Sequence, residues 1–292
     1  MTTLGVVFRP QLPPEQLRPL VRLADAAGVE ELWLWEDCFL ESGIAAASAA
    51  LAWTERLHVG VGLLPVPLRN VALASMEAAT LYRLFPERVT LAVGHGVQDW
   101  MGQVGARPDS PLTLLREYLG AMRSLLRGEE VSADGEYVRL DKVALDWPPH
   151  RAPAVFAGGV GPRTLRLTGE AADGTVLDAS TSPDGMRAAR RLIEEGRAAA
   201  GRDADAPHKV VVYLLAATGP GAADRVRAEL ASDRRVLSPE LGAAGDAEAV
   251  AAAVRELAAA GADTVVLQPT ADEPDPAGFV RFVAEEVRGL VP

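Results

Sequence analysis

Two adjacent carboxylates and a thiol follow one another in the run Trp35-Glu36-Asp37-Cys38. A carboxylate at this place could act as a general acid or base, or could orient a cofactor. Equally, one of the pair could do no more than cap the helix that follows. Cys38 is the only cysteine of the chain, and a single cysteine is more often a small buried apolar residue than a nucleophile. We expect one of the two carboxylates to point into a site.

His95 is the second candidate, because it lies between Gly94 and Gly96 in the run Gly94–Trp100. A neutral imidazole in an accessible turn is well suited to move protons near neutral pH. The alternative is a loop histidine that is merely held by hydrogen bonds. The other three histidines lack even this context, so His95 is the candidate for proton transfer.

Glycine and proline shape the segment Gly60–Asn70, in which Gly60 and Gly62 precede two prolines. Glycine permits positive φ and the close approach of a flat ligand. The same residues could also form a simple corner between a strand and a loop. Arg69, at the end of the segment, could hold an anion or pair with a surface carboxylate.

A second glycine-rich segment, Gly158-Gly159-Val160-Gly161, stands directly before Pro162, a residue suited to the first position of a helix. Backbone N–H groups in such a loop and the positive end of the helix dipole can cradle a phosphate. One glycine loop is a weak signal alone, but its place between a strand and a helix strengthens it. Taken together, the glycine segments favour a flat cofactor that carries a phosphate.

Eight short apolar runs alternate with amphipathic helices and would position these segments. The predicted strands are Leu4–Phe8, Glu31–Trp35, Leu57–Leu64, Val89–Val93, Ala154–Ala157, Thr175–Leu177, Lys209–Ala216 and Thr264–Leu267. Apolar strands covered by helices indicate a parallel sheet. Because no linker divides the chain, we predict one (β/α)₈ TIM barrel over residues 1–292. The candidate segments follow strands two to five, so they should meet at the C-terminal rim.

Residues 129–149 interrupt this alternation before the fifth strand. Asp134-Gly135 lies there between two strand-like runs, a pattern typical of a hairpin. We predict an inserted hairpin that could form a lid or a dimer contact.

Composition excludes several function classes. The formal charge of −11 and the absence of Lys/Arg runs argue against nucleic-acid or anionic membrane partners. With no basic leader, no apolar stretch of about 20 residues and one cysteine, we expect a cytoplasmic protein without a membrane span. Lys142 and Lys209, the only lysines, are poorly placed for Schiff-base chemistry, and scattered histidines predict no metal site.

The order of these loops resembles that of luciferase-like monooxygenases and their F420-dependent relatives, over nearly the whole chain. The resemblance rests on Arg56–Gly62 with Arg69-Asn70, Pro86–Gly94, Leu115–Tyr118 with Leu126–Glu129, Gly158–Pro162 and Gly169–Gly174. It implies that a flavin-type ring stacks on a bulge ending strand three, with a non-prolyl cis peptide at Gly62-Leu63. It also implies that the cofactor phosphate sits on Gly158, Gly159, Val160 and Gly161.

Relatives of the F420-dependent type often carry Asp-His after strand two, where this chain has Asp37-Cys38. Asp37 is therefore carried over as a catalytic residue and the histidine is not. Either His95 supplies proton transfer, or hydride addition to an activated double bond needs no side-chain acid.

The resemblance thus implies hydride transfer between coenzyme F420 and a small organic substrate. The alternative is a monooxygenase that uses reduced FMN, oxygen and a separate reductase. A third hypothesis is a non-catalytic flavin-binding barrel. Members of this family are commonly homodimers, so a homodimer is expected.

Overall fold

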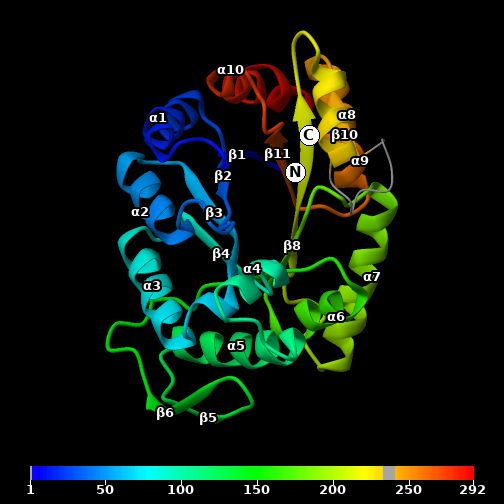
Figure 1. Cartoon of the computed structure of the whole chain (residues 1–292). Coiled ribbons are helices and arrows are strands. Elements are labelled where there is room, and N and C mark those ends of the chain that lie inside the picture. Colours follow the sequence, from blue (N-terminus) through cyan, green and yellow to red (C-terminus); the bar gives the residue numbers. More distant parts are fainter. Residues whose placement is uncertain (1, 233–240) are drawn as a thin grey trace.

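Eight parallel strands close into a barrel in the computed structural model, which describes residues 2–232 and 241–292 (Figure 1). They are β1 (Thr3–Val7), β2 (Glu31–Leu34), β3 (His58–Pro65), β4 (Val89–Gly94), β7 (Val155–Gly158), β8 (Gly174–Leu177), β9 (Lys209–Ala217) and β11 (Thr264–Pro269). Neighbours pair in the order β9-β11-β1-β2-β3-β4-β7-β8, and a further pairing of β8 with β9 closes the ring. All eight predicted strands and the barrel are confirmed.

Helices surround the strands on the outside (Figure 1). They are α1 (Leu17–Ala27), α2 (Gly43–Trp53), α3 (Val71–Leu84), α4 (Gln98–Gln103), α5 (Pro111–Leu126), α6 (Pro162–Ala171), α7 (Pro183–Ala199), α8 (Ala222–Ser232), α9 (Ala247–Ala259) and α10 (Pro276–Arg281). Side-chain caps begin several of them, as Ser110 does for α5 and Asp246 for α9. Gly28 ends α1 with φ 78°, a conformation that favours glycine. None of the described helices is long and apolar enough to cross a membrane.

Strand alternation divides the apolar core into an outer layer under the helices and an inner layer within the barrel. The inner layer consists of Val7, Trp33, Ala92, Phe156, Val176, Val211, Tyr213 and Val266. Trp33 fills the barrel because the neighbouring strand carries Gly60, where a Cβ would lie 2.4 Å from the indole. The glycine of this segment is thus required by packing inside the barrel.

The predicted hairpin is present as β5 (Val131–Asp134) and β6 (Arg139–Val143), which pair antiparallel beside α5 (Figure 1). Glu117 of α5 fixes it, because its carboxylate accepts hydrogen bonds from the N–H groups of Tyr137 and Val138 at 2.9 and 3.0 Å. The hairpin therefore lies against the outer helices.

Three elements differ from the predictions. The short helix α4 and the strand β10 (Gly242–Ala244), which pairs with β9, were not predicted. The C-terminal segment is not one regular amphipathic helix: α10 is followed by a π-helical turn, Phe282–Val287, and a 3₁₀ turn, Arg288–Leu290. Elements of three to six residues are too short for a clear apolar period.

Candidate active site at the C-terminal rim of the barrel

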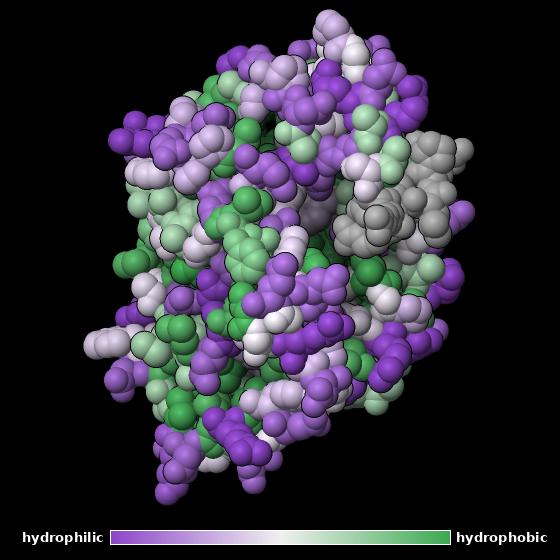
Figure 2. Space-filling view, in the orientation of Figure 1, coloured by the Kyte–Doolittle hydropathy of each residue, from purple (hydrophilic) through white to green (hydrophobic). Residues whose placement is uncertain are grey.

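A cavity of about 540 Å³ opens at the carboxyl ends of the strands. Figure 2 shows the face on which α4 lies, hollowed near its centre. The predicted residues that line the cavity are Asp37, Gly62, Leu63, His95, Gly158, Gly159, Val160 and Gly161. Segments that are far apart in sequence thus meet in one place, as barrel closure requires.

The end of β3 forms one wall of this cavity. Its register with β4 shifts between Val61 and Leu64, and the Gly62-Leu63 peptide bond is cis, as the resemblance implied. The Leu63 side chain projects toward the ends of β4 and β7: a Cβ on Gly94 or Gly158 would lie within 2.5 Å of Leu63 Cδ2. Glycine at both positions therefore makes room for Leu63, which contributes an apolar surface to the cavity.

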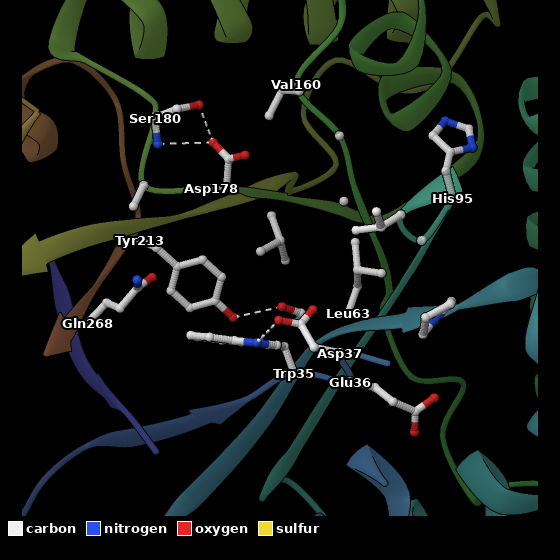
Figure 3. A pocket seen from close by; sticks show the side chains of 18 of the residues that line it. Trp35, Glu36, Asp37, Leu63, His95, Val160, Asp178, Ser180, Tyr213 and Gln268 are labelled. Atoms are coloured by element: carbon white, nitrogen blue, oxygen red, sulfur yellow. Dashed lines mark hydrogen bonds between the residues drawn. The ribbon is translucent and has the colours of Figure 1, made fainter. Parts of the chain in front are cut away.

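Tyr213 supports the same strand end from across the barrel. Its hydroxyl donates a hydrogen bond to the Gly62 carbonyl oxygen at 3.0 Å. Burial raises the pKa of Tyr213, so the phenol stays protonated and remains a donor. Trp35 meets the Tyr213 ring edge-on, with 5.7 Å between ring centroids. Figure 3 shows both rings below the open part of the cavity.

Asp37 is the carboxylate that enters this space. Its Oδ2 accepts a hydrogen bond from Trp35 Nε1 at 2.9 Å, which fixes the carboxylate beside the Trp35 and Tyr213 rings (Figure 3). One residue further along the chain, the Cys38-Phe39 peptide bond is also cis. No sequence pattern indicated this cis bond. The fixed position of Asp37 allows its carboxylate to accept a hydrogen bond from a bound hydroxyl group, and so to orient and polarise that group.

Glu36 has the structural role that the sequence left open. Its Oε2 accepts a hydrogen bond from Gly43 N at 2.8 Å, at the start of α2, and its carboxylate forms a two-point ion pair with Arg69. Arg69 also contacts Glu77, with 3.2 Å from Nε to Oε2. The structure therefore does not bring Arg69 to the cavity beside the other predicted residues, because both carboxylates hold it behind the wall.

His95 lies at the glycine-loop end of the cavity, apart from Asp37 (Figure 3). Its Nδ1 is 3.1 Å from the Pro111 carbonyl oxygen and must donate to it, so Nε2 accepts from the Thr164 hydroxyl, 3.2 Å away. Burial lowers the pKa of His95, although the bond to Pro111 opposes this shift. A neutral imidazole results, with both nitrogens engaged.

The glycine loop joins β7 to α6. Gly159 N donates to the Val176 carbonyl oxygen at 3.3 Å, and α6 begins at Pro162 after Gly161. The N–H groups of Val160 and Gly161 have no acceptor among the described residues. With the N-terminus of α6 beside them, these donors fit a phosphate.

Further lining residues were missed by the sequence analysis, among them Arg9, Trp100, Asp178, Ser180, Tyr213, Glu229 and Gln268. Asp178 directly follows β8, and its position at a strand end was a usable signal. Arg9 bonds Glu229 of α8 and the Pro269 carbonyl oxygen at 2.6 and 2.9 Å. Tyr213 lies inside an apolar strand, where its sequence context resembles ordinary core.

Comparisons with known proteins agree with this geometry. The family model for luciferase-like monooxygenases matches residues 3–237. Among curated proteins, a 5,10-methylenetetrahydromethanopterin reductase of Methanolobus tindarius is 28% identical over 69% of this chain and 61% of its own. An F420-dependent glucose-6-phosphate dehydrogenase of Mycolicibacterium smegmatis is 32% identical over 69% of this chain and 64% of its own. The matches thus span about three fifths of these curated relatives.

Solved structures share the whole fold. An F420-dependent secondary alcohol dehydrogenase in complex with an F420-acetone adduct superposes with a TM-score of 0.87 at 21% identity, covering 100% of this chain and 99% of that one. The F420-dependent tetrahydromethanopterin reductase of Methanopyrus kandleri gives 0.82 at 21% identity, with coverage of 100% and 99%. Since the family model covers most of the sequence, this chain belongs to the luciferase-like monooxygenase family of oxidoreductases.

Proposed function

We propose that this protein transfers a hydride between coenzyme F420 and a small organic substrate. The observation that carries the proposal is one cavity with two different ends. At one end, the backbone N–H groups of Val160 and Gly161 have no hydrogen-bond acceptor among the described residues, and at the other end Leu63 forms an apolar surface beside Asp37. A phosphate-bearing planar cofactor needs both ends. F420, when bound, supplies or accepts the hydride, and the protein supplies position and electrostatics.

Each residue has a proposed part. Leu63 and the Gly62 carbonyl form the surface for the ring, and the Tyr213 hydroxyl holds that carbonyl in place. Val160 and Gly161 donate N–H groups to the phosphate. Asp37 accepts a hydrogen bond from a hydroxyl group of the substrate and so orients it, because its carboxylate is fixed by Trp35.

Proton transfer by His95 would run through Thr164. The Thr164 hydroxyl donates to Nε2 and stands in the first turn of α6, next to the glycine loop. A hydroxyl both donates and accepts, so it can pass a proton between the imidazole and a group in the cavity. If no proton is needed, the same contact still holds Thr164 beside the loop.

The curated relatives support F420 over FMN as the cofactor, since the dehydrogenase is named as F420-dependent. A monooxygenase in complex with FMN, the oxygenating constituent of 3,6-diketocamphane monooxygenase from Pseudomonas putida, has the same fold at 17% identity and a TM-score of 0.78. The fold therefore accommodates both cofactors in different proteins. The choice between them needs a binding measurement.

A homodimer is part of the proposal. The outer face of α3 exposes Leu73, Met76 and Leu84, with 48, 57 and 66% of each residue accessible, and Phe39 and Leu40 are exposed as well. Large apolar side chains gathered on one helix face favour burial against a partner.

The test is a fluorescence titration of the purified protein with F420 and, separately, with FMN. Saturable binding of F420 and weaker binding of FMN are expected. Gly161→Asp places a carboxylate at the proposed phosphate site, where the added side chain has open space, and should abolish this binding. Gly161→Ala is the matched control and should bind like the parent protein. Tight FMN binding with no response to F420 would overturn the cofactor assignment.

A further inference from the structure

A second cavity, of about 470 Å³, lies outside the barrel rim between the loop after β3, the segment after α4, and the hairpin. Its lining includes the side chains of Arg69, Arg107 and Arg139 and contains no aspartate or glutamate. This is unusual in a chain with a formal charge of −11. The cavity is therefore a local concentration of positive charge in an acidic protein.

The arginines of this second cavity have donors to spare. Arg107 is exposed and has no hydrogen bond or ion pair among the described residues. Arg139 makes a 3.9 Å contact with Asp134, whose side chain is 99% exposed, and such a surface pair contributes little. Its Nε also donates a long hydrogen bond of 3.5 Å to the Gly135 carbonyl oxygen, so its two terminal nitrogens remain available. Arg69 uses one N–H of each of its three nitrogens on Glu36 and Glu77, so a second N–H remains on each terminal nitrogen.

Tyr118 gives an independent indication of a ligand. This residue of α5 lines the second cavity and is only 2% exposed, yet its hydroxyl has no hydrogen-bond partner among the described residues. Buried polar groups are nearly always satisfied. Burial raises the pKa of Tyr118, so the hydroxyl remains a donor at neutral pH. The hydroxyl oxygen is not among the fully buried atoms without a partner, so it reaches the cavity, and an acceptor bound there would complete its hydrogen bonding.

The remaining walls suit an organic rather than a bare inorganic ion. Val66, Leu68 and Leu114 give the cavity apolar sides. The N-terminus of the 14-residue helix α3 also opens here at Asn70 and Val71, which adds the positive end of a helix dipole. We propose that the second cavity binds a small organic anion, whose carboxylate or phosphate accepts hydrogen bonds from Tyr118 and the three arginines. This site is independent of the cofactor assignment above.

Calorimetric titration with phenyl phosphate, and with inorganic phosphate for comparison, tests the proposal. The glycine loop also fits a phosphate, so the Gly161→Asp variant, in which that loop is blocked, is titrated beside the parent protein. Any phenyl phosphate that Gly161→Asp still binds is bound at the second cavity. Phenyl phosphate should bind more tightly than phosphate. Arg107→Gln and Tyr118→Phe should each weaken it about tenfold, the loss expected for one charge-assisted hydrogen bond.

Arg151→Gln is the control, because the Arg151 side chain is 90% exposed, lies outside this lining and makes only a 3.7 Å contact with Glu87. It should leave the titration unchanged. Arg107 is exposed, so Arg107→Gln is expected to fold, and circular dichroism checks this. The proposal is overturned if Gly161→Asp shows no saturable binding of phenyl phosphate, or if Arg107→Gln and Tyr118→Phe bind it as the parent does.

Discussion

The Tyr213 hydroxyl reaches across the barrel to the carbonyl oxygen of Gly62, 3.0 Å away. Tyr213 lies on β9 and Gly62 on β3, four strands further along the ring. This bond is the direct polar link between one side of the barrel and the strand end on which the cofactor ring is proposed to lie.

Replacing Tyr213 with phenylalanine should therefore loosen that strand end. The Gly62 carbonyl would lose its partner, at a cost of about 1–3 kcal/mol in the free energy of unfolding. Urea unfolding measures this loss, and cofactor titration should show weaker binding. Tyr82→Phe is the control: its hydroxyl also pairs with one backbone group, accepting a hydrogen bond from Leu91 N, and neither residue lines the cavity. It should affect stability alone. Equal cofactor affinity in both variants would contradict the role given to Tyr213.

Gly158→Ala tests the space that Leu63 occupies. The new Cβ would lie 2.3 Å from Leu63 Cδ2, so the leucine must move and the ring surface changes. We expect about 1–3 kcal/mol of destabilisation, typical of overpacking, together with weaker cofactor binding. Gly161→Ala meets nothing within 4 Å and should change neither quantity. If the double variant Gly158→Ala/Leu63→Ala failed to recover stability relative to Gly158→Ala, the contact would not be the cause.

Asp37→Asn preserves shape and the bond from Trp35 but removes the charge. If Asp37 orients and polarises the substrate hydroxyl, turnover should fall by about 100-fold or more, while the cofactor dissociation constant stays within about twofold. Stopped-flow reduction of the oxidised cofactor by a panel of small alcohols measures the first quantity. Unchanged turnover on every substrate that the parent accepts would remove Asp37 from the mechanism.

Acid should destabilise the protein through His208. This buried imidazole donates from Nε2 to the Thr175 hydroxyl, 2.9 Å away, which in turn donates to Thr168. Burial, aided by Arg197, Arg202 and Arg190, lowers its pKa to about 4. Because the unfolded chain binds this proton more readily than the folded chain, stability is complete above about pH 6.5 and is lost as the pH falls toward 4.

His208→Gln keeps a donor toward Thr175 and removes the titration. Its free energy of unfolding should change less between pH 7 and pH 4.5 than that of the parent, by about 2 kcal/mol. Urea unfolding at both pH values gives the difference. Parallel pH dependences in the two proteins would show that His208 is protonated equally in both states.

The proposed dimer is tested at α3. Met76→Glu places a charge in the middle of the exposed apolar face and should convert a dimer into a monomer in sedimentation velocity. Leu290→Glu, at a residue 40% exposed near the C-terminus, should leave the assembly unchanged. A parent chain that sediments as a monomer would end this part of the proposal.

Much of the fold was predictable because each barrel strand is a buried apolar run of its own. The run Val89–Val93, for instance, has no other stable place than the interior. The glycine loop was predictable because Pro162 marks where α6 begins. In both cases the signal lies within a few neighbouring residues.

The parts that escaped prediction depend on contacts between distant residues. The ion pair of Arg69 was not predictable, since nothing in its neighbourhood reveals that Glu36, 33 positions earlier, faces it. His95 lines the cavity as expected, but nothing in its neighbourhood reveals that Pro111 and Thr164 engage its two nitrogens. Tyr213 looked like core for the same reason. Such pairings arise only when the ring of strands has closed.

The ion pair of Arg69 and Glu36 lies between the two cavities. Glu36 lines the cavity at the barrel rim, and Arg69 lines the second cavity outside it. An anion that accepts from the spare N–H groups of Arg69 shares this guanidinium with the Glu36 carboxylate, which also accepts from Gly43 N in the first turn of α2. By thermodynamic linkage, an anion in the second cavity and a ligand in the barrel cavity then change each other's binding free energy by the same amount. Through the Arg69 guanidinium, occupancy of the second cavity would in this way change ligand affinity at the barrel rim.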